Sequence, residues 1–208
     1  MAMSSIEKVT KTTENRFLNM YDLDIRNKNG QKGLYHVASR AEDISELKLN
    51  THVNRPDGVI IYALYGEQKD RVVLIRQYRF SIGDYIYEFP AGLLDKGETY
   101  QQAGMRELKE ETGLTFHPFE VDEIYSRPYF TTIGMTDESC AAVYGTADGT
   151  LSKAGLEDGE EIEVVLADRN EIRRILREEH VSLMCAYMMM HFLSADPENP
   201  LSFLNIKK

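Results

Sequence analysis

The stretch Gly92–Leu114 constrains this 208-residue chain more than any other part of its sequence. It reads GLLDKGETYQQAGMRELKEETGL, which is a glycine-containing turn followed by a run that predicts a helix ending at Gly113. Within that helix Glu107, Glu110 and Glu111 share one face, being three and four residues apart. Carboxylates at this spacing repel each other, and the last turn of a helix favours cations. A divalent cation would offset this cost, and all-oxygen ligands favour Mg²⁺, with Mn²⁺ as the alternative.

Acidic faces are also common on solvated surface helices, so the wider pattern has to decide between the two interpretations. The Nudix box consists of Gly, five residues, Glu, seven residues, and then Arg-Glu-aliphatic-x-Glu-Glu-x-Gly-aliphatic. This sequence matches it without departure at Gly92, Glu98, Arg106, Glu107, Leu108, Glu110, Glu111, Gly113 and Leu114. The chain therefore resembles a Nudix hydrolase, over roughly Asp57 to Ala195.

Three further motifs are similar to the ADP-ribose pyrophosphatase branch, whose members hydrolyse nucleoside diphosphate sugars. Arg76-Gln77-Tyr78-Arg79 matches a strand motif of that branch, and arginine at a strand end can bind phosphate with two hydrogen bonds. Surface charge on an edge strand explains these arginines equally well without the resemblance. Glu88-Phe89-Pro90-Ala91 precedes Gly92, and Pro128 follows in the position of a branch marker. The resemblance implies a substrate site containing Arg76, Arg79, Glu88 and Pro128.

The resemblance also implies roles for the residues of the box and its neighbours. The metal ligands would be Glu107, Glu110, Glu111 and the backbone carbonyl of Ala91. The supporting residues would be Gly92, Glu98, Arg106 and Gly113. Of these, Glu98 and Arg106 are expected to pair and to brace the turn against the helix.

The segment Arg127–Asp137 predicts a long loop, and such loops inside compact domains are usually functional or disordered. In the family, a glutamate of this loop acts as the general base on the attacking water. Glu138 matches by position and Asp137 is the alternative, while an acid that only caps a strand is the competing interpretation. The expected catalytic residues are accordingly Glu138, Glu107 and Glu111.

Short apolar runs on both sides of the box predict a sheet. Val59–Leu64 is almost entirely apolar, as in a strand buried on both faces. Other strands are expected at Arg71–Arg79, Tyr85–Phe89, Phe119–Tyr125, Ser139–Gly145 and Ile162–Leu166, with helices after Asp168 and Ser182. On the last helix the apolar stripe Leu183, Met184, Tyr187, Met188, Met190 and Phe192 is expected to pack in the core. The resemblance implies an α/β fold, an α/β/α sandwich with a mixed sheet.

The N-terminal part predicts an antiparallel extension to that sandwich. Residues 1–14 are polar and expected to be frayed, whereas residues 16–40 predict a hairpin, which alone is marginal in water. We expect an N-terminal strand extension over 1–55 and a catalytic domain over 56–208. In the branch that this chain resembles, the extension exchanges with a partner subunit and supplies part of the adenosine pocket. The resemblance therefore implies a homodimer, with Tyr21, Tyr35 and Tyr85 as candidates for stacking on the base.

Composition excludes several other classes of function. The net charge is −10 with no basic run, which argues against non-specific nucleic-acid binding. No apolar stretch reaches bilayer length, and the N-terminus lacks the apolar core of a signal peptide, so a cytoplasmic soluble protein is expected.

The expected function is Mg²⁺-dependent hydrolysis of the pyrophosphate bond of ADP-ribose or a related nucleoside diphosphate sugar, giving a nucleoside monophosphate and a sugar phosphate. One alternative is another sugar nucleotide such as GDP-mannose, because Tyr-Phe follows Pro128 where the family usually has glycine. The other alternative is a sensor that binds its ligand without cleaving it. The complete set of costly carboxylates argues against a sensor.

Overall fold

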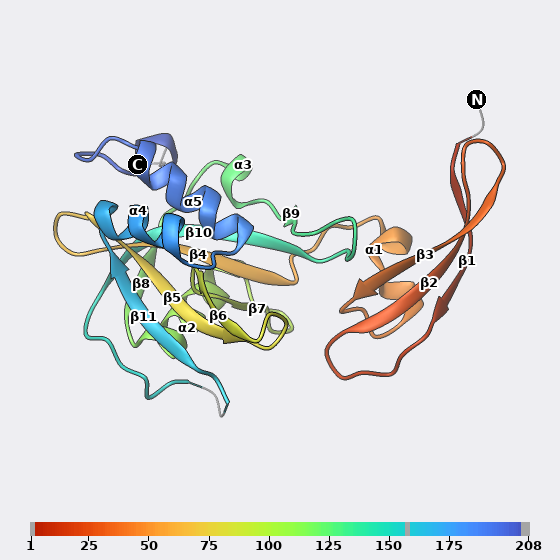
Figure 1. Ribbon diagram of the computed structural model, residues 1–208, viewed down its shortest axis with the longest axis horizontal. Helices are drawn as coiled ribbons and strands as arrows, with labels where there is room; N and C mark the ends of the chain where they lie inside the picture. Colours follow the sequence, from red (N-terminus) through yellow and green to blue (C-terminus); the bar gives the residue numbers. More distant parts are fainter. Residues whose placement is uncertain (1–2, 157–158, 205–208) are drawn as a thin grey trace. The chain divides into compact units, whose positions relative to one another are not determined.

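The computed structural model describes residues 3–156 and 159–204 (Figure 1). The chain divides into two compact units, which are described separately. The N-terminal unit contains the residues up to Asp57 together with Pro128–Cys140, and the second unit contains Gly58–Arg127 and the residues from Ala141 onward. The segment 128–140, which sequence placed within the catalytic domain, thus folds with the N-terminal residues. Exchange of the extension between subunits stays a prediction.

The N-terminal unit is built on an antiparallel three-stranded sheet of β1 (Ser5–Lys11), β2 (Asn19–Arg26) and β3 (Lys32–Ser39), in that order. Tyr21 and Leu23 alternate with more exposed residues along β2 and pack with Val37 and Leu47. Leu47 lies between two short helices, η1 (Ile44–Glu46) and α1 (Lys48–Thr51). The expected β2–β3 hairpin is confirmed, and this small core is the surface on which it packs.

Two expectations for this unit were wrong. Residues 5–11 are not frayed but form β1, because the open edge of β2 offers backbone hydrogen bonds and Val9 packs against the small core. Tyr21 has no exposed surface, and its hydroxyl donates to the Ala41 carbonyl at 2.6 Å. It is therefore unavailable for stacking on a ligand.

The second unit is centred on a sheet in which β11, β5, β4, β10 and β8 are neighbours in that order. Its strands are β4 (Gly58–Tyr65), β5 (Arg71–Arg79), β6 (Asp84–Glu88), β7 (Ala91–Leu93), β8 (Thr115–Pro118), β10 (Ser139–Asp148) and β11 (Ile162–Ala167). Of these, β10 begins in the N-terminal unit, where the two-residue strand β9 (Tyr129–Phe130) pairs with its start. Strand β6 pairs with β5, and β7 pairs with β4.

Helices cover both faces of this sheet. Val59, Ile61 and Ala63 of β4 pack against Ala103 and Leu108 of α2 (Tyr100–Thr112). Figure 1 shows α4 (Arg169–Glu178) and α5 (Leu183–Ser194) together on the other side of the sheet. Every residue of β4 except the last is buried, as its apolar run predicts. The predicted α/β/α arrangement is confirmed. No helix in the described part of the chain is both long and apolar enough to cross a bilayer.

Two details of the second unit differ from expectation. The span Phe119–Tyr125 is not a strand, because the pairing of β8 ends at Pro118 and Asp122 then caps the short helix α3 (Glu123–Ser126). On α5 the buried residues are Cys185, Met189 and Phe192. Only Phe192 of the expected stripe is among them, and Leu183, Met184, Tyr187 and Met190 are exposed.

Candidate active site

Helix α2 presents the acidic face predicted from the sequence, and local signals fix both of its ends. Thr99 caps the first turn, since its hydroxyl accepts from the Gln102 N–H and the Gln102 side chain accepts from the Thr99 N–H. Gly113 closes the helix with φ of +77°, a left-handed conformation that favours glycine. With its apolar face on the sheet, α2 turns Glu107 and Glu111 towards β7.

Glycine at position 92 leaves room for the Glu107 carboxylate beside β7, because a Cβ there would overlap that carboxylate as it now lies. One residue earlier, the Ala91 N–H donates to Glu111 Oε2 at 3.2 Å. Two carboxylates on successive turns therefore converge on the backbone of residues 91 and 92. Glu111 is only 5% exposed, which is unusual for an acidic residue.

Burial makes the charged forms of these two carboxyl groups costly. It is the main reason that the pKa of Glu111 lies well above its ordinary value, and the negative charge of Glu107 adds to it. Burial also raises the pKa of Glu107, although the neighbouring Arg106 opposes this. A site that holds two such carboxylates together is electrostatically suited to a bound cation.

Arg106 connects the turn to the helix. It donates to both oxygens of Glu98, from Nε at 3.1 Å and from Nη2 at 2.9 Å. Its Nη1 donates to Glu107 Oε1 at 2.7 Å and to Glu110 Oε2 at 3.2 Å. Its Nη2 also donates to the Leu93 carbonyl at 3.0 Å. The expected pair of Arg106 with Glu98 is thus present, and the same guanidinium neutralises part of the acidic face.

The chemistry of these side chains fits a hard divalent cation. Within residues 3–156 and 159–204, no three His, Cys, Asp or Glu side chains are arranged around a common metal position. The contacts explain this, because Arg106 holds Glu107 and Glu110 while Glu111 accepts from a backbone N–H. All the candidate ligand atoms are oxygens, as Mg²⁺ and Mn²⁺ prefer. The buried Glu111 carboxylate is the one that most requires a compensating positive charge.

The paired strands β5 and β6 carry the residues expected to bind substrate. The Arg79 Nε donates to Glu88 Oε2 at 2.7 Å, and the positive charge of Arg79 lowers the pKa of Glu111. Arg79 therefore lies within electrostatic range of the acidic face. The guanidinium carbon of Arg76 instead lies over the Tyr85 ring, 4.2 Å from its centroid. Arg76 and Arg79 thus belong to different groups of side chains.

A further carboxylate, Glu160, acts on the same site and was missed by the sequence analysis. Its negative charge raises the pKa of both Glu107 and Glu111. The only signal in the sequence is the acidic pair Glu160–Glu161 directly before the last strand. An acidic pair at the start of a strand is too common on protein surfaces to indicate a site by itself.

The backbone that leads towards Glu160 follows the C-terminal end of α2. The Ser152 N–H donates to the Thr112 carbonyl at 2.9 Å. A Cβ on Gly155 would overlap backbone atoms of Glu110, so the two backbones are in close contact there. This path brings a segment some fifty positions further along the chain back to the acidic helix.

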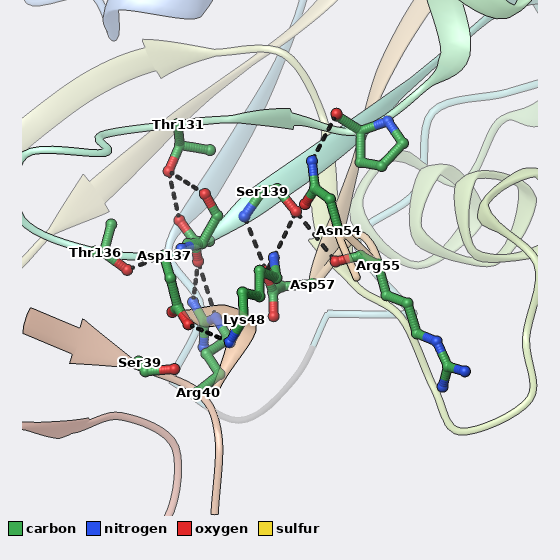
Figure 2. Close-up of polar contacts among 12 residues, drawn as sticks. Ser39, Arg40, Lys48, Asn54, Arg55, Asp57, Thr131, Thr136, Asp137 and Ser139 are labelled. Atoms are coloured by element: carbon green, nitrogen blue, oxygen red, sulfur yellow. Dashed lines mark hydrogen bonds and ion pairs between the residues drawn. The ribbon is translucent and has the colours of Figure 1, made fainter. Parts of the chain in front are cut away.

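The remaining predicted residues, Pro128, Asp137 and Glu138, lie in the N-terminal unit. Figure 2 labels Asp137 and its neighbours there. Glu138 Oε1 pairs with the Arg40 guanidinium at 2.8 Å, and Glu138 Oε2 accepts from the Thr131 hydroxyl at 3.1 Å. Both carboxylate oxygens of Glu138 therefore have partners within this unit. Asp137 and Pro128 also have local partners: Asp137 accepts from a backbone N–H of α1, and the Pro128 carbonyl accepts from the Asn54 side chain.

The start of β10 is held by a compact ionic network within the same unit. Lys48 Nζ lies 2.6 Å from Asp57 Oδ2 and 2.6 Å from Ser139 Oγ. The Ser139 N–H donates to the same Asp57 oxygen at 2.8 Å. Figure 2 shows the Arg55 side chain extending away from these contacts, although the Arg55 carbonyl accepts from Ser139 Oγ. The network fixes the residue that follows Glu138 and so restricts the backbone next to that carboxylate.

Comparisons with known proteins agree on one family. A model of the NUDIX domain matches residues 54–187. The chain is similar to putative nudix hydrolase 2 of Caenorhabditis elegans, with 39% identity over 56% of this chain and 53% of the relative. It thus spans about half the length of that relative. It is also similar to the methanol dehydrogenase activator of Bacillus methanolicus, with 31% identity over 62% of this chain and 67% of the relative.

Two further matches cover most of the chain. The ADP-ribose pyrophosphatase of Bacillus subtilis is 27% identical over 86% of this chain and 88% of its own length. The crystal structure of an ADP compounds hydrolase superposes with a TM-score of 0.60 at 18% identity, covering 86% of this chain and 85% of the other. At that identity the structural match establishes a shared fold and nothing finer.

Proposed function

We propose that this chain, which belongs to the Nudix family, hydrolyses the pyrophosphate bond of ADP-ribose or a related nucleoside diphosphate sugar in a Mg²⁺-dependent reaction. The products would be a nucleoside monophosphate and a sugar phosphate. The observation that carries the proposal is the convergence of Glu107 and Glu111 on Ala91 and Gly92. The similarity to the Bacillus subtilis ADP-ribose pyrophosphatase supports this class of substrate.

In this proposal Glu107, Glu110, Glu111 and the Ala91 carbonyl hold Mg²⁺, or Mn²⁺ in its place. A bound divalent cation polarises a phosphoryl group and lowers the pKa of a bound water. To serve as ligands, Glu107 and Glu110 would release their hydrogen bonds from Arg106. Arg106 would then stay anchored through its remaining bonds to Glu98 and Leu93, so the turn keeps its position.

Arg79 is the proposed partner of the diphosphate. Its positive charge acts electrostatically on Glu111 of the acidic face. In this structure its Nε donates to Glu88 Oε2 at 2.7 Å. A diphosphate could share the guanidinium with Glu88 or replace it, because guanidinium groups bind phosphate with two parallel hydrogen bonds. Glu88 would then be free to accept from a substrate hydroxyl. Arg76 is proposed to contact substrate from the neighbouring group around Tyr85.

The carboxylate that removes a proton from the attacking water has two candidates. Glu138 is the candidate from its position in the sequence, and both of its oxygens have partners in the N-terminal unit. Glu160 is the candidate from its surroundings, since its charge acts on Glu107 and Glu111. We favour Glu160, because it belongs to the same unit as Glu107 and Glu111 and its charge acts on both, whereas both oxygens of Glu138 are already engaged by Arg40 and Thr131.

We further propose that the protein is a cytoplasmic homodimer in which the N-terminal unit contributes to the nucleoside site. That unit has a cavity of about 520 Å³, lined by apolar side chains such as Met20 and Met135 and by the Arg40–Glu138 pair. This volume is suited to a group the size of a nucleoside. Light scattering on the purified protein should give the mass of two chains, and the mass of one chain would contradict the dimer.

The experiment that tests the function is incubation with Mg²⁺ and a panel of ADP-ribose, ADP-glucose and GDP-mannose, coupled to a phosphatase that attacks only the monophosphate products. We expect the fastest phosphate release from ADP-ribose. A chelator should abolish release, and excess Mg²⁺ should restore it. Fastest release from GDP-mannose would favour the alternative substrate. No release from any compound, together with measurable binding of one of them, would favour the sensor.

A further inference from the structure

Tyr85 of β6 makes a contact that its expected role in base stacking does not explain. Its hydroxyl donates to Glu161 Oε2 at 2.7 Å. The backbone of Glu161 is held from the same place, because its carbonyl accepts from the Tyr78 N–H at 3.2 Å. Tyr78 and Tyr85 are cross-strand partners in β5 and β6. The cross-strand pair Tyr78 and Tyr85 therefore binds both the backbone and the side chain of Glu161.

The Tyr85 ring is itself fixed on the surface of the sheet. The Arg76 guanidinium lies over it at 4.2 Å, and the Tyr78 ring meets it in an edge-to-face arrangement at 5.4 Å between centroids. Arg76 is in turn paired with Glu163 of β11 at 3.2 Å. A ring held in this way has little rotational freedom, so its hydroxyl is directed at Glu161 before any ligand binds. One face of the ring is covered by Arg76 and the hydroxyl is engaged by Glu161.

Glu161 directly follows Glu160. The chain before Glu160 and the chain after it are held by different contacts. Before it, the chain is held against α2 by Ser152 and by the close approach of Gly155. At Glu161 itself the support is the Tyr85 hydroxyl together with the Tyr78 N–H. A catalytic group displaced by about 1 Å can lose about a hundredfold in rate, so this second support bears directly on Glu160.

We propose that Tyr85 is a positioning residue, which holds Glu160 beside the acidic face of α2 through its hydrogen bond to Glu161. The inference rests on the proposed function, and specifically on the role of Glu160 in it. Tyr85 need not touch the substrate or the metal in this arrangement. Its effect should therefore fall on the rate of the chemical step and not on substrate affinity.

Four variants of the full-length protein test the inference. Tyr85→Phe keeps the ring and removes only the hydroxyl, and Glu161→Ala removes the acceptor. We expect each to lower kcat about five- to tenfold with KM within about twofold of wild type. Glu161→Gln should remain close to wild type, because the amide oxygen still accepts from the phenol. The double variant Tyr85→Phe/Glu161→Ala should be no slower than either single variant, because both remove one interaction.

Hydrogen exchange provides a readout that does not depend on turnover. Amides of residues 159–163 should exchange several times faster in Tyr85→Phe than in wild type, whereas those of α4 should not change. Unchanged exchange at 159–163 would overturn the inference, and so would faster exchange with unchanged kcat. A rise in KM alone would overturn it in favour of a substrate contact. Failure of the proposed function would look different. In that case Tyr85→Phe would still exchange faster at residues 159–163, but the wild-type protein itself would hydrolyse none of the substrates.

Discussion

Replacing Glu111 with glutamine should lower kcat by about a thousandfold or more while leaving the fold intact. Stabilisation of the transition state by a bound metal is worth several kcal/mol, and this variant removes the buried charge on which the proposed metal site depends. The amide has nearly the same shape as the carboxylate, and its oxygen can still accept from the Ala91 N–H. Activity is lost here through the loss of charge and not through repacking. Turnover of ADP-ribose and the thermal midpoint should be measured on the same preparation.

In the absence of metal, the stability of the wild type and that of Glu111→Gln should depend differently on pH. The pKa of Glu111 is raised in the folded state, chiefly by burial, so its contribution to stability is fully present below the ordinary pKa of glutamate. This contribution is lost as the pH rises through the folded-state pKa, because the buried carboxylate then has to ionise. Glutamine does not ionise. The difference in Tm, variant minus wild type, should therefore become more positive as the pH rises above the ordinary pKa of glutamate.

Added Mg²⁺ should make the wild type more thermally stable than Glu111→Gln, which is the opposite of the order expected for the metal-free proteins at higher pH. A ligand that binds only the folded state raises its stability, so Mg²⁺ should raise the Tm of wild type much more than that of Glu111→Gln. Glu120→Gln, a change at an exposed position of the same unit, is the matched control and should behave as wild type. Mg²⁺-dependent hydrolysis retained by Glu111→Gln would show that the metal assignment is wrong.

The parts of the fold that were predicted correctly are those whose signals are local. The glycine at position 113 ends α2 as predicted, whereas the Thr99 cap that begins the helix was not singled out in the sequence. The apolar run of β4 predicts burial on both faces whatever lies on either side. Helix α5 shows where local signals fail. It is apolar around most of its circumference, so periodicity does not choose a buried face, and packing buries Met189 while leaving Leu183 exposed.

The parts of the site that were missed depend on contacts between distant segments. Glu160 acts on α2 only because the chain returns along the end of that helix, with Gly155 against Glu110. Nothing in the residues around Glu160 encodes that return. Likewise, the segment 128–140 folds with the N-terminal residues through the Arg40–Glu138 pair and the hydrogen bond from Lys48 to Ser139, whose members no periodic pattern relates. The carboxylates proposed as metal ligands could be named from the sequence because one helix carries Glu107, Glu110 and Glu111, whereas contacts between distant segments could not.

The comparison of Glu160→Gln with Glu138→Gln should decide which segment supplies the base. General-base catalysis typically contributes about 10²- to 10⁴-fold, so Glu160→Gln should lower kcat by that order with little change in KM. A loss of that size with KM almost unchanged is not expected from a residue that only shapes the binding site.

For Glu138→Gln we expect a smaller loss of turnover and a clear loss of stability. The substitution leaves Arg40 facing an uncharged amide, and it weakens the link between β3 and the segment 128–140. Partly buried ion pairs that lose one partner destabilise because the remaining charge is uncompensated. Arg40→Gln should give a similar fall in Tm, which makes it the matched control. A loss of 10²-fold or more in Glu138→Gln, with an unchanged Tm and an active Glu160→Gln, would instead assign the base to Glu138.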